Sequence, residues 1–174
     1  MHTVILAALC LAGCAASSAP PVTPLSGRAP VDPRAAQPPA AGSVDDAVRL
    51  AVFRYLMNHN ASAAQTAVPF ICLEIHQGGD TRDPSPFIMA AMSGGKIRVV
   101  PGSTCEQSAQ GVFLKGDSGG LVFWTQKVTI DGDKATVSGG YFEAGLSASG
   151  NLYTVERQRD GSWLVTKDEM EWIS

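Results

Sequence analysis

From residue 43 onward, apolar positions recur with the period of an α-helix. The apolar stripe comprises Val44, Val48, Ala51, Val52 and Tyr55, which share one helical face. Ser43 is a favourable N-cap, and Asp45 and Asp46 suit the positive end of the helix dipole. The pattern predicts a helix that begins after Ser43 and ends within Asn58–Asn60, followed by a short second helix over 61–68.

A short apolar run and another helix signal come next. Phe70–Ile75 predicts a strand, which the Gly78-Gly79 turn follows. Asp83-Pro84 has the form of an N-cap with proline at the first helical position, which predicts a short helix through Met92. Lys96–Val100 is then expected to form a short strand.

The rest of the chain predicts a meander of four long antiparallel strands, at 121–130, 134–144, 152–159 and 163–167. Asp131-Gly132 and Asp160-Gly161 indicate hairpins, and a Gly/Ser/Asn loop is expected before residue 152. The connections are too short for a crossover helix, so no parallel crossover is expected among these strands. The predicted fold class is α+β: N-terminal helices packed on a curved, cone-like antiparallel sheet, after a disordered tether.

The segment before residue 43 has a different composition. Val4–Gly13 is an uncharged apolar run, only about half as long as a bilayer-spanning helix, and predicts the core of a signal peptide. Ala15–Gly42 is rich in alanine and proline and has no aromatic residue, which predicts a disordered tether. We therefore expect a signal peptide at 1–13, a lipidated cysteine and tether at 14–42, and a single domain at 43–174.

Leu11-Ala12-Gly13-Cys14 resembles the lipobox of bacterial lipoproteins. The resemblance implies cleavage before Cys14 and acylation of that cysteine, which would anchor the protein in a membrane. Ala15, rather than an aspartate, follows the cysteine; in double-membraned bacteria this implies the outer membrane, with the domain facing the periplasm or the cell surface. An ordinary secretory signal, cut after Ala16 or Ala19, is the alternative.

The order of helix, strand, short helix and strand meander carries a second resemblance, together with residues near the C-terminus. These residues are Gly139–Phe142, Leu146–Ala148, Gly150-Asn151, Tyr153, Trp163, Lys167-Asp168 and Trp172–Ser174. They are similar to small bacterial proteins of the nuclear-transport-factor-two-like and cystatin-like folds. Enzymes of that kind use a His/Asp or Tyr/Asp pair inside the cone, and the sequence alone places no such pair. The resemblance therefore implies a fold rather than an activity.

Charge and length exclude some functions. The chain has 174 residues, with 13 Lys+Arg against 16 Asp+Glu, so it has no net positive charge that would attract nucleic acid. Its length is also below the roughly 250 residues of a (β/α)₈ barrel. His59, His76, Glu74, Asp80 and Asp83 could in principle bind a metal, but isolated pairs such as Glu74-x-His76 arise by chance. We expect no metal and no cofactor.

The four cysteines divide by position. Cys10 lies in the predicted signal peptide, and Cys14 is the predicted lipidation site. The remaining two, Cys72 and Cys105, lie in an exported domain, where oxidising surroundings favour a disulfide between them. Free thiols or metal ligation are the alternatives.

Gly116–Gly120 reads GDSGG, the sequence around the nucleophile of chymotrypsin-like serine proteases. In that interpretation Ser118 would be the nucleophile, with His76 or His59 as the base. A domain of 43–174 is too short for two six-stranded barrels, and neither histidine has the sequence context of that family. A glycine-rich turn before a strand accounts for the same residues.

Aromatic and basic residues on the predicted strands are candidates for a ligand pocket: Trp124, Tyr141, Tyr153, Arg157 and Trp163. The alternative is that the aromatic residues fill the core between sheet and helix. We therefore expect a membrane-anchored envelope lipoprotein with a small, non-enzymatic binding or accessory domain. Its expected partner is a small molecule, a glycan or an envelope protein. The alternative function is a hydrolase that uses the cone pocket or Ser118.

Overall fold

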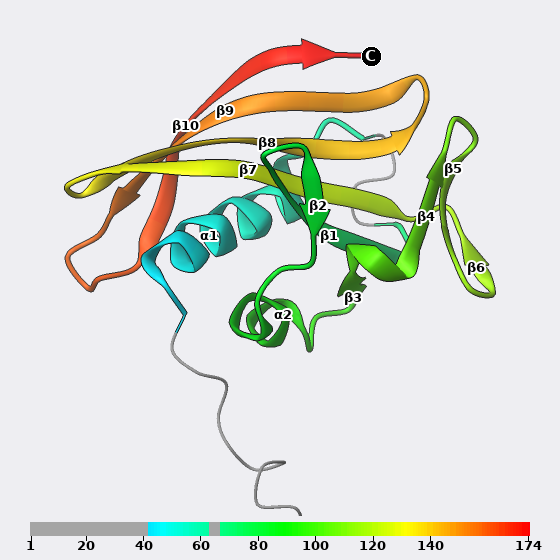
Figure 1. Cartoon of the computed structure of the whole chain (residues 1–174), viewed down its shortest axis with the longest axis horizontal. Coiled ribbons are helices and arrows are strands. Elements are labelled where there is room, and N and C mark those ends of the chain that lie inside the picture. The colour runs from blue at the N-terminus through cyan, green and yellow to red at the C-terminus, as the bar shows by residue number, and fades with distance from the viewer. Residues whose placement is uncertain (1–41, 63–66) are drawn as a thin grey trace, which may run out of the picture. The chain divides into compact units, whose positions relative to one another are not determined.

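The structure is a computed structural model that describes residues 42–62 and 67–174. The predicted signal peptide, the lipidation site Cys14 and nearly all of the tether lie outside the described residues. Within 42–62 and 67–174, no helix is long and apolar enough to cross a membrane. These residues form an α+β domain with two α-helices and a large, mainly antiparallel sheet (Figure 1).

Helix α1 (Val44–His59) is the helix that the apolar stripe predicts. Its first turn is closed by a reciprocal capping box. The backbone N–H of Asp46 donates to the Ser43 hydroxyl at 3.1 Å, and the Ser43 N–H donates to the Asp46 carboxylate at 3.3 Å. These bonds satisfy helix N–H groups that have no partner within the helix, so Ser43 sets where the helix begins.

The large sheet has the strand order β10-β9-β8-β7-β1-β2, with β3 also paired to β1. Its strands are β1 (Phe70–Gln77), β2 (Asp80–Arg82), β3 (Arg98–Pro101), β7 (Leu121–Asp131), β8 (Lys134–Ala144), β9 (Ser147–Arg157) and β10 (Trp163–Ile173). The predicted meander of four long strands is confirmed as β7 to β10. The prediction of an antiparallel sheet was wrong for β1, however, because β1 pairs in parallel with both β7 and β3.

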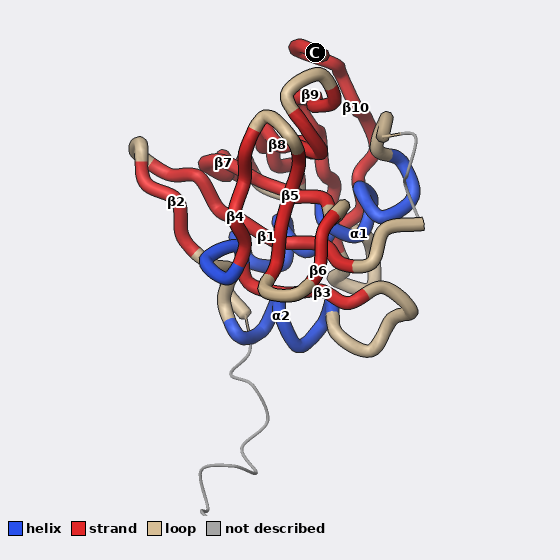
Figure 2. The backbone as a smooth tube through the Cα atoms, turned by 90° about the vertical axis from the view of Figure 1, so that its right-hand side faces the viewer, coloured by secondary structure: helices blue, strands red, loops and turns tan. Residues whose placement is uncertain are grey.

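A second, smaller sheet and a second helix lie in the connection between β1 and β7. Helix α2 (Pro86–Met92) precedes β3, and the single turn η1 (Gly102–Thr104) leads into β4 (Cys105–Ser108). Strands β5 (Gly111–Leu114) and β6 (Asp117–Ser118) complete a sheet of order β4-β5-β6. Figure 2 turns this small sheet toward the viewer.

The two faces of the large sheet bury different clusters. One face shares the main hydrophobic cluster with α1, through residues such as Leu73, Phe123 and Val52. The opposite face meets the small sheet in a second cluster of Phe70, Cys72, Val112, Leu114 and Val122. Strand β1 and the first half of β7 are therefore buried on both sides, which explains their unbroken apolar runs.

Several predicted boundaries differ from the structure. The cap of α2 is Ser85 with Pro86 in the first turn, rather than Asp83-Pro84, because the Asp83 carboxylate accepts two bonds from Ser103 instead. The expected helix over 61–68 lies partly outside the described residues, and its described positions are not helical. The loop expected before residue 152 is the first half of β9, and β10 continues to Ile173.

The disulfide between Cys72 and Cys105 is present, and it leads to a prediction. Replacing both cysteines with serine should lower the free energy of unfolding by roughly 3–4 kcal/mol, because the crosslink restricts a long loop in the unfolded chain. Chemical denaturation of the oxidised protein and of the double variant measures the difference. Reductant should destabilise the natural protein and leave the variant unchanged; equal stability of the two oxidised proteins would contradict the prediction.

Candidate functional site

The five residues predicted to line a pocket do not converge. Tyr141 and Tyr153 are 2% and 1% exposed and lie in the main cluster with α1. Trp124 belongs to the other face of the sheet, since its neighbour Phe123 points into that cluster. Arg157 and Trp163 line a separate hollow of about 380 Å³ beside the first turn of α1. The tyrosines are core residues, and Trp124 has other neighbours.

Ser118 lies near the start of β1, on a strand of the small sheet, whereas His76 lies near the end of β1. Ser118 is exposed on β6, three residues before Leu121, which pairs with Ile71 near the start of β1. His76 follows Ile71 by five residues, which corresponds to about 16 Å along an extended strand. The adjacent Asp117 is bound to Arg98, at 3.1 Å. The structure thus does not bring the GDSGG serine to the histidine that a triad would need.

A row of aromatic side chains crosses the face of the large sheet opposite α1. Trp124 on β7 pairs with Gly140 on β8, Gly140 with Gly150 on β9, and Gly150 with Trp172 on β10. The two indole rings are nearly parallel, at 9°, with centroids 6.3 Å apart. The ring of His76 lies on the other side of Trp124 at 5.5 Å and 5°. We call His76, Trp124 and Trp172 the aromatic row.

Two glycines make room for the indoles of the aromatic row. A Cβ atom on Gly150 would lie 2.2 Å from Nε1 of Trp172, whereas one on Gly140 would lie 1.9 Å from the Ser149 carbonyl oxygen and 3.0 Å from the Trp124 ring. The rings therefore lie close over the backbone of β8 and β9, where any other residue would place a side chain. Glycine within a strand costs roughly 0.5–1 kcal/mol relative to alanine, so the arrangement of the rings has a cost in stability.

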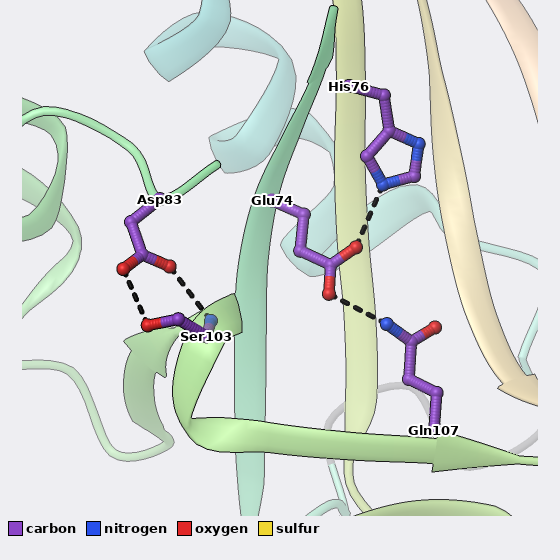
Figure 3. Close-up of polar contacts among 5 residues, drawn as sticks. All are labelled: Glu74, His76, Asp83, Ser103 and Gln107. Atoms are coloured by element: carbon purple, nitrogen blue, oxygen red, sulfur yellow. Dashed lines mark hydrogen bonds and ion pairs between the residues drawn. The ribbon is translucent and has the colours of Figure 1, made fainter. Parts of the chain in front are cut away.

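The aromatic row ends in a buried carboxylate. Glu74 pairs with Trp124 across β1 and β7 and is 4% exposed. One carboxylate oxygen lies 2.8 Å from Nε2 of His76, and the other accepts a bond of 2.7 Å from the Gln107 amide on β4 (Figure 3). The pair holds the His76 ring in place, and Gln107 is exposed beside it. Strand β1 of the large sheet and strand β4 of the small sheet thus contribute polar groups to one end of the row.

The disulfide and the Glu74–Gln107 bond together fix the small sheet on this face. Cys72 and Glu74 point the same way from β1, and their partners Cys105 and Gln107 are two residues apart on β4. The Asp83–Ser103 pair, with bonds of 2.6 and 2.8 Å, holds the turn before β4 (Figure 3). The small sheet therefore covers the end of the face near Phe70 and leaves the aromatic row beside it.

A buried arginine supports the strand that carries Trp124. Arg49 of α1 is 4% exposed and donates to the Thr125 hydroxyl at 3.0 Å and to the Gln126 carbonyl. These bonds lie where the β7–β8 register shifts, directly after Trp124. Burial lowers the pKa of Arg49, but two acceptors close to the guanidinium compensate for its lost hydration.

On the α1 side, the structure places a tyrosine–aspartate cluster that the sequence could not place. Tyr153 pairs with Asp168 across β9 and β10, and its ring meets that of Tyr55 edge-on at 5.8 Å. Burial, followed by the charge of Asp168, raises the pKa of both tyrosines. Asp168 also accepts a bond from Asn151 at 2.5 Å. The phenols remain protonated, and the cluster ties α1 to the last two strands.

Two members of the site were missing from the sequence-based candidates. Trp172 lies beyond the predicted end of its strand, and Gln107 was not assigned to any site, whereas Glu74 was considered only as a possible metal ligand and His76 as a metal ligand or a catalytic base. The alternation Glu74-x-His76 was the one available signal, because residues two apart on a strand share a face. Among residues 42–62 and 67–174, no three His, Cys, Asp or Glu side chains are grouped to hold a metal ion.

Alanine substitutions at the two glycines should separate the rings from the backbone. Gly150→Ala should change stability by less than about 1 kcal/mol, since the exposed Trp172 ring can move away, and should shift tryptophan emission to the red. Gly140→Ala should cost more than about 2 kcal/mol, because its Cβ would lie 1.9 Å from the Ser149 carbonyl oxygen. Denaturation and emission spectra measure both; equal destabilisation by the two variants would contradict this geometry.

Comparisons with known proteins leave the function to be argued from these residues. No protein-family model, curated protein or solved structure matches the chain. The resemblances to lipoproteins and to the cone folds thus stay predictions from the sequence. Function belongs to sites rather than to folds, so the aromatic row and its carboxylate carry the interpretation.

Proposed function

We propose that this protein is an envelope lipoprotein, anchored through Cys14, whose domain binds a ligand on the aromatic row. The lipobox at 11–14 supports the anchor, and the Cys72–Cys105 disulfide suits an exported domain. The domain would face the periplasm or the cell surface and act without catalysing a reaction. Its partner would be a small molecule, a glycan or another envelope component.

The observation that carries the binding function is a pair of solvent-exposed rings on either side of a buried one. Trp172 is 46% exposed and the side chain of His76 is 36% exposed, whereas Trp124 between them is 8% exposed. The three ring planes are nearly parallel, with glycines beneath the indoles and the Glu74 bond to His76 supporting this arrangement. Large apolar rings gain stability by burial, yet Trp172 stays exposed over Gly150, a residue that lowers the stability of its strand. A surface maintained at such a cost is typical of a binding site.

The hydrolase alternative receives no support from the geometry. Ser118 lies on β6 near the start of β1, His76 lies near the end of β1, and His76 is bound to Glu74. The tyrosine–aspartate cluster joins α1 to β10, where Tyr153 is fully buried. Each polar group has a structural role in its place.

The anchor can be tested with two cysteine variants. Cys14→Ser should abolish incorporation of a labelled fatty acid and move the protein out of the membrane fraction, because the serine hydroxyl does not replace the acylated thiol. Cys10→Ser, within the predicted signal peptide, should leave both properties unchanged. Metabolic labelling and cell fractionation give the result. A Cys14→Ser protein that still carries the lipid and remains in the membrane would sink the proposal.

The binding surface can be tested by photocrosslinking in intact cells. A photoreactive amino acid in place of Trp172 should give crosslinks to envelope material, since the row would contact its ligand there. The same probe in place of Met170 is the matched control, because Met170 is 57% exposed on the same strand but faces away from the row. Equal crosslinking at the two positions, or none at either, would refute this assignment.

A further inference from the structure

We infer that the ligand of the aromatic row is an uncharged glycan chain. This inference rests on the proposed function and names the chemistry of its ligand. It follows from three properties of the face: the orientation of the rings, the polar groups at one end, and the balance of charge around them.

The orientation of the rings selects a ligand with a flat apolar face. Neighbouring rings are parallel to within 5° and 9°, and their centroids are 5.5 and 6.3 Å apart. Rings that enclose a cationic headgroup must face it from several directions, and three parallel rings cannot do so. A pyranose ring, in contrast, has a flat C–H face that packs on an aromatic ring while its hydroxyls point sideways.

The polar groups at the end of the row suit those hydroxyls. The Gln107 amide uses one N–H toward Glu74 and also carries a second N–H and a carbonyl oxygen. Glu74 is itself 4% exposed, so its carboxylate orients His76 and Gln107 rather than contacting a ligand directly. A sugar hydroxyl is both donor and acceptor, so the remaining N–H and the carbonyl oxygen of the exposed Gln107 amide can bind it in either role.

The charge on the face favours a neutral ligand. Along β8 to β10, the side chains of the same face include two ion pairs, Lys134–Glu156 at 3.1 Å and Lys167–Glu169 at 2.9 Å. Between the ion pairs, Thr129, Thr136 and Thr154 pair in register across three strands and add hydroxyls. Opposite charges in contact leave little net field, and the Glu74 carboxylate at the end of the row adds a negative charge that disfavours acidic ligands. The face therefore extends the row as a hydroxyl-bearing, balanced surface on which a chain of several sugars can lie.

The test uses the full-length lipoprotein in detergent, on an array of linear neutral glycans, acidic glycans and proline-rich peptides. We expect binding to neutral glycans. Tryptophan fluorescence then gives the affinity for the neutral glycan with the strongest signal. Trp172→Ala should weaken binding at least about tenfold, as expected for loss of an aromatic contact. Gln107→Ala should weaken it less, and salt should have little effect.

The matched control is Met170→Ala, since Met170 is 57% exposed on the same strand but faces away from the row; it should bind normally. Binding that is limited to acidic glycans, or to peptides, would overturn the glycan inference. If Trp172→Ala weakened that binding, the aromatic row would still be the binding surface. If no array member binds while position 172 crosslinks in cells, the glycan inference also fails and the proposed function stands. Loss of both signals refutes both.

Discussion

The covalent bond between Cys72 and Cys105 joins the two sheets of this domain, and the site lies where it does because of that bond. Strand β1 is the central element: it pairs with β7, β2 and β3, packs against α1 on one face and meets the small sheet on the other. The disulfide and the Glu74–Gln107 bond attach β4 at two successive positions of one face of β1. This attachment determines which part of the face is covered and which part is left to the aromatic row.

Local sequence patterns predicted much of the architecture. The feature that they did not predict is a pairing between strands far apart in the sequence. The cap at Ser43 and the apolar stripe over Val44–Tyr55 predicted α1, and turn residues predicted the hairpins between β7 and β10. The parallel pairing of β1 with β7 was missed because the two strands are separated by the small sheet in the chain. Their continuous apolar runs were the available sign, since a strand buried on both faces does not alternate.

The site was harder to predict than the fold, for a similar reason. Trp124 was among the predicted pocket residues, but its neighbours Trp172 and His76 come from strands that only the register brings together. Tyr141 and Tyr153 are aromatic residues on strands, as ligand-binding residues often are, yet their side chains lie on the buried face of the sheet. A single bulge reverses which face a residue occupies, and β10 contains two such shifts before Trp172.

The glycines beneath the indoles have a consequence for the thermodynamics of binding. Side chains that are free in solution lose rotamer freedom when a ligand immobilises them. Trp124 is buried over Gly140, and His76 is held by Glu74. These two rings lose their rotamer freedom during folding, so a ligand has to order only Trp172 when it binds.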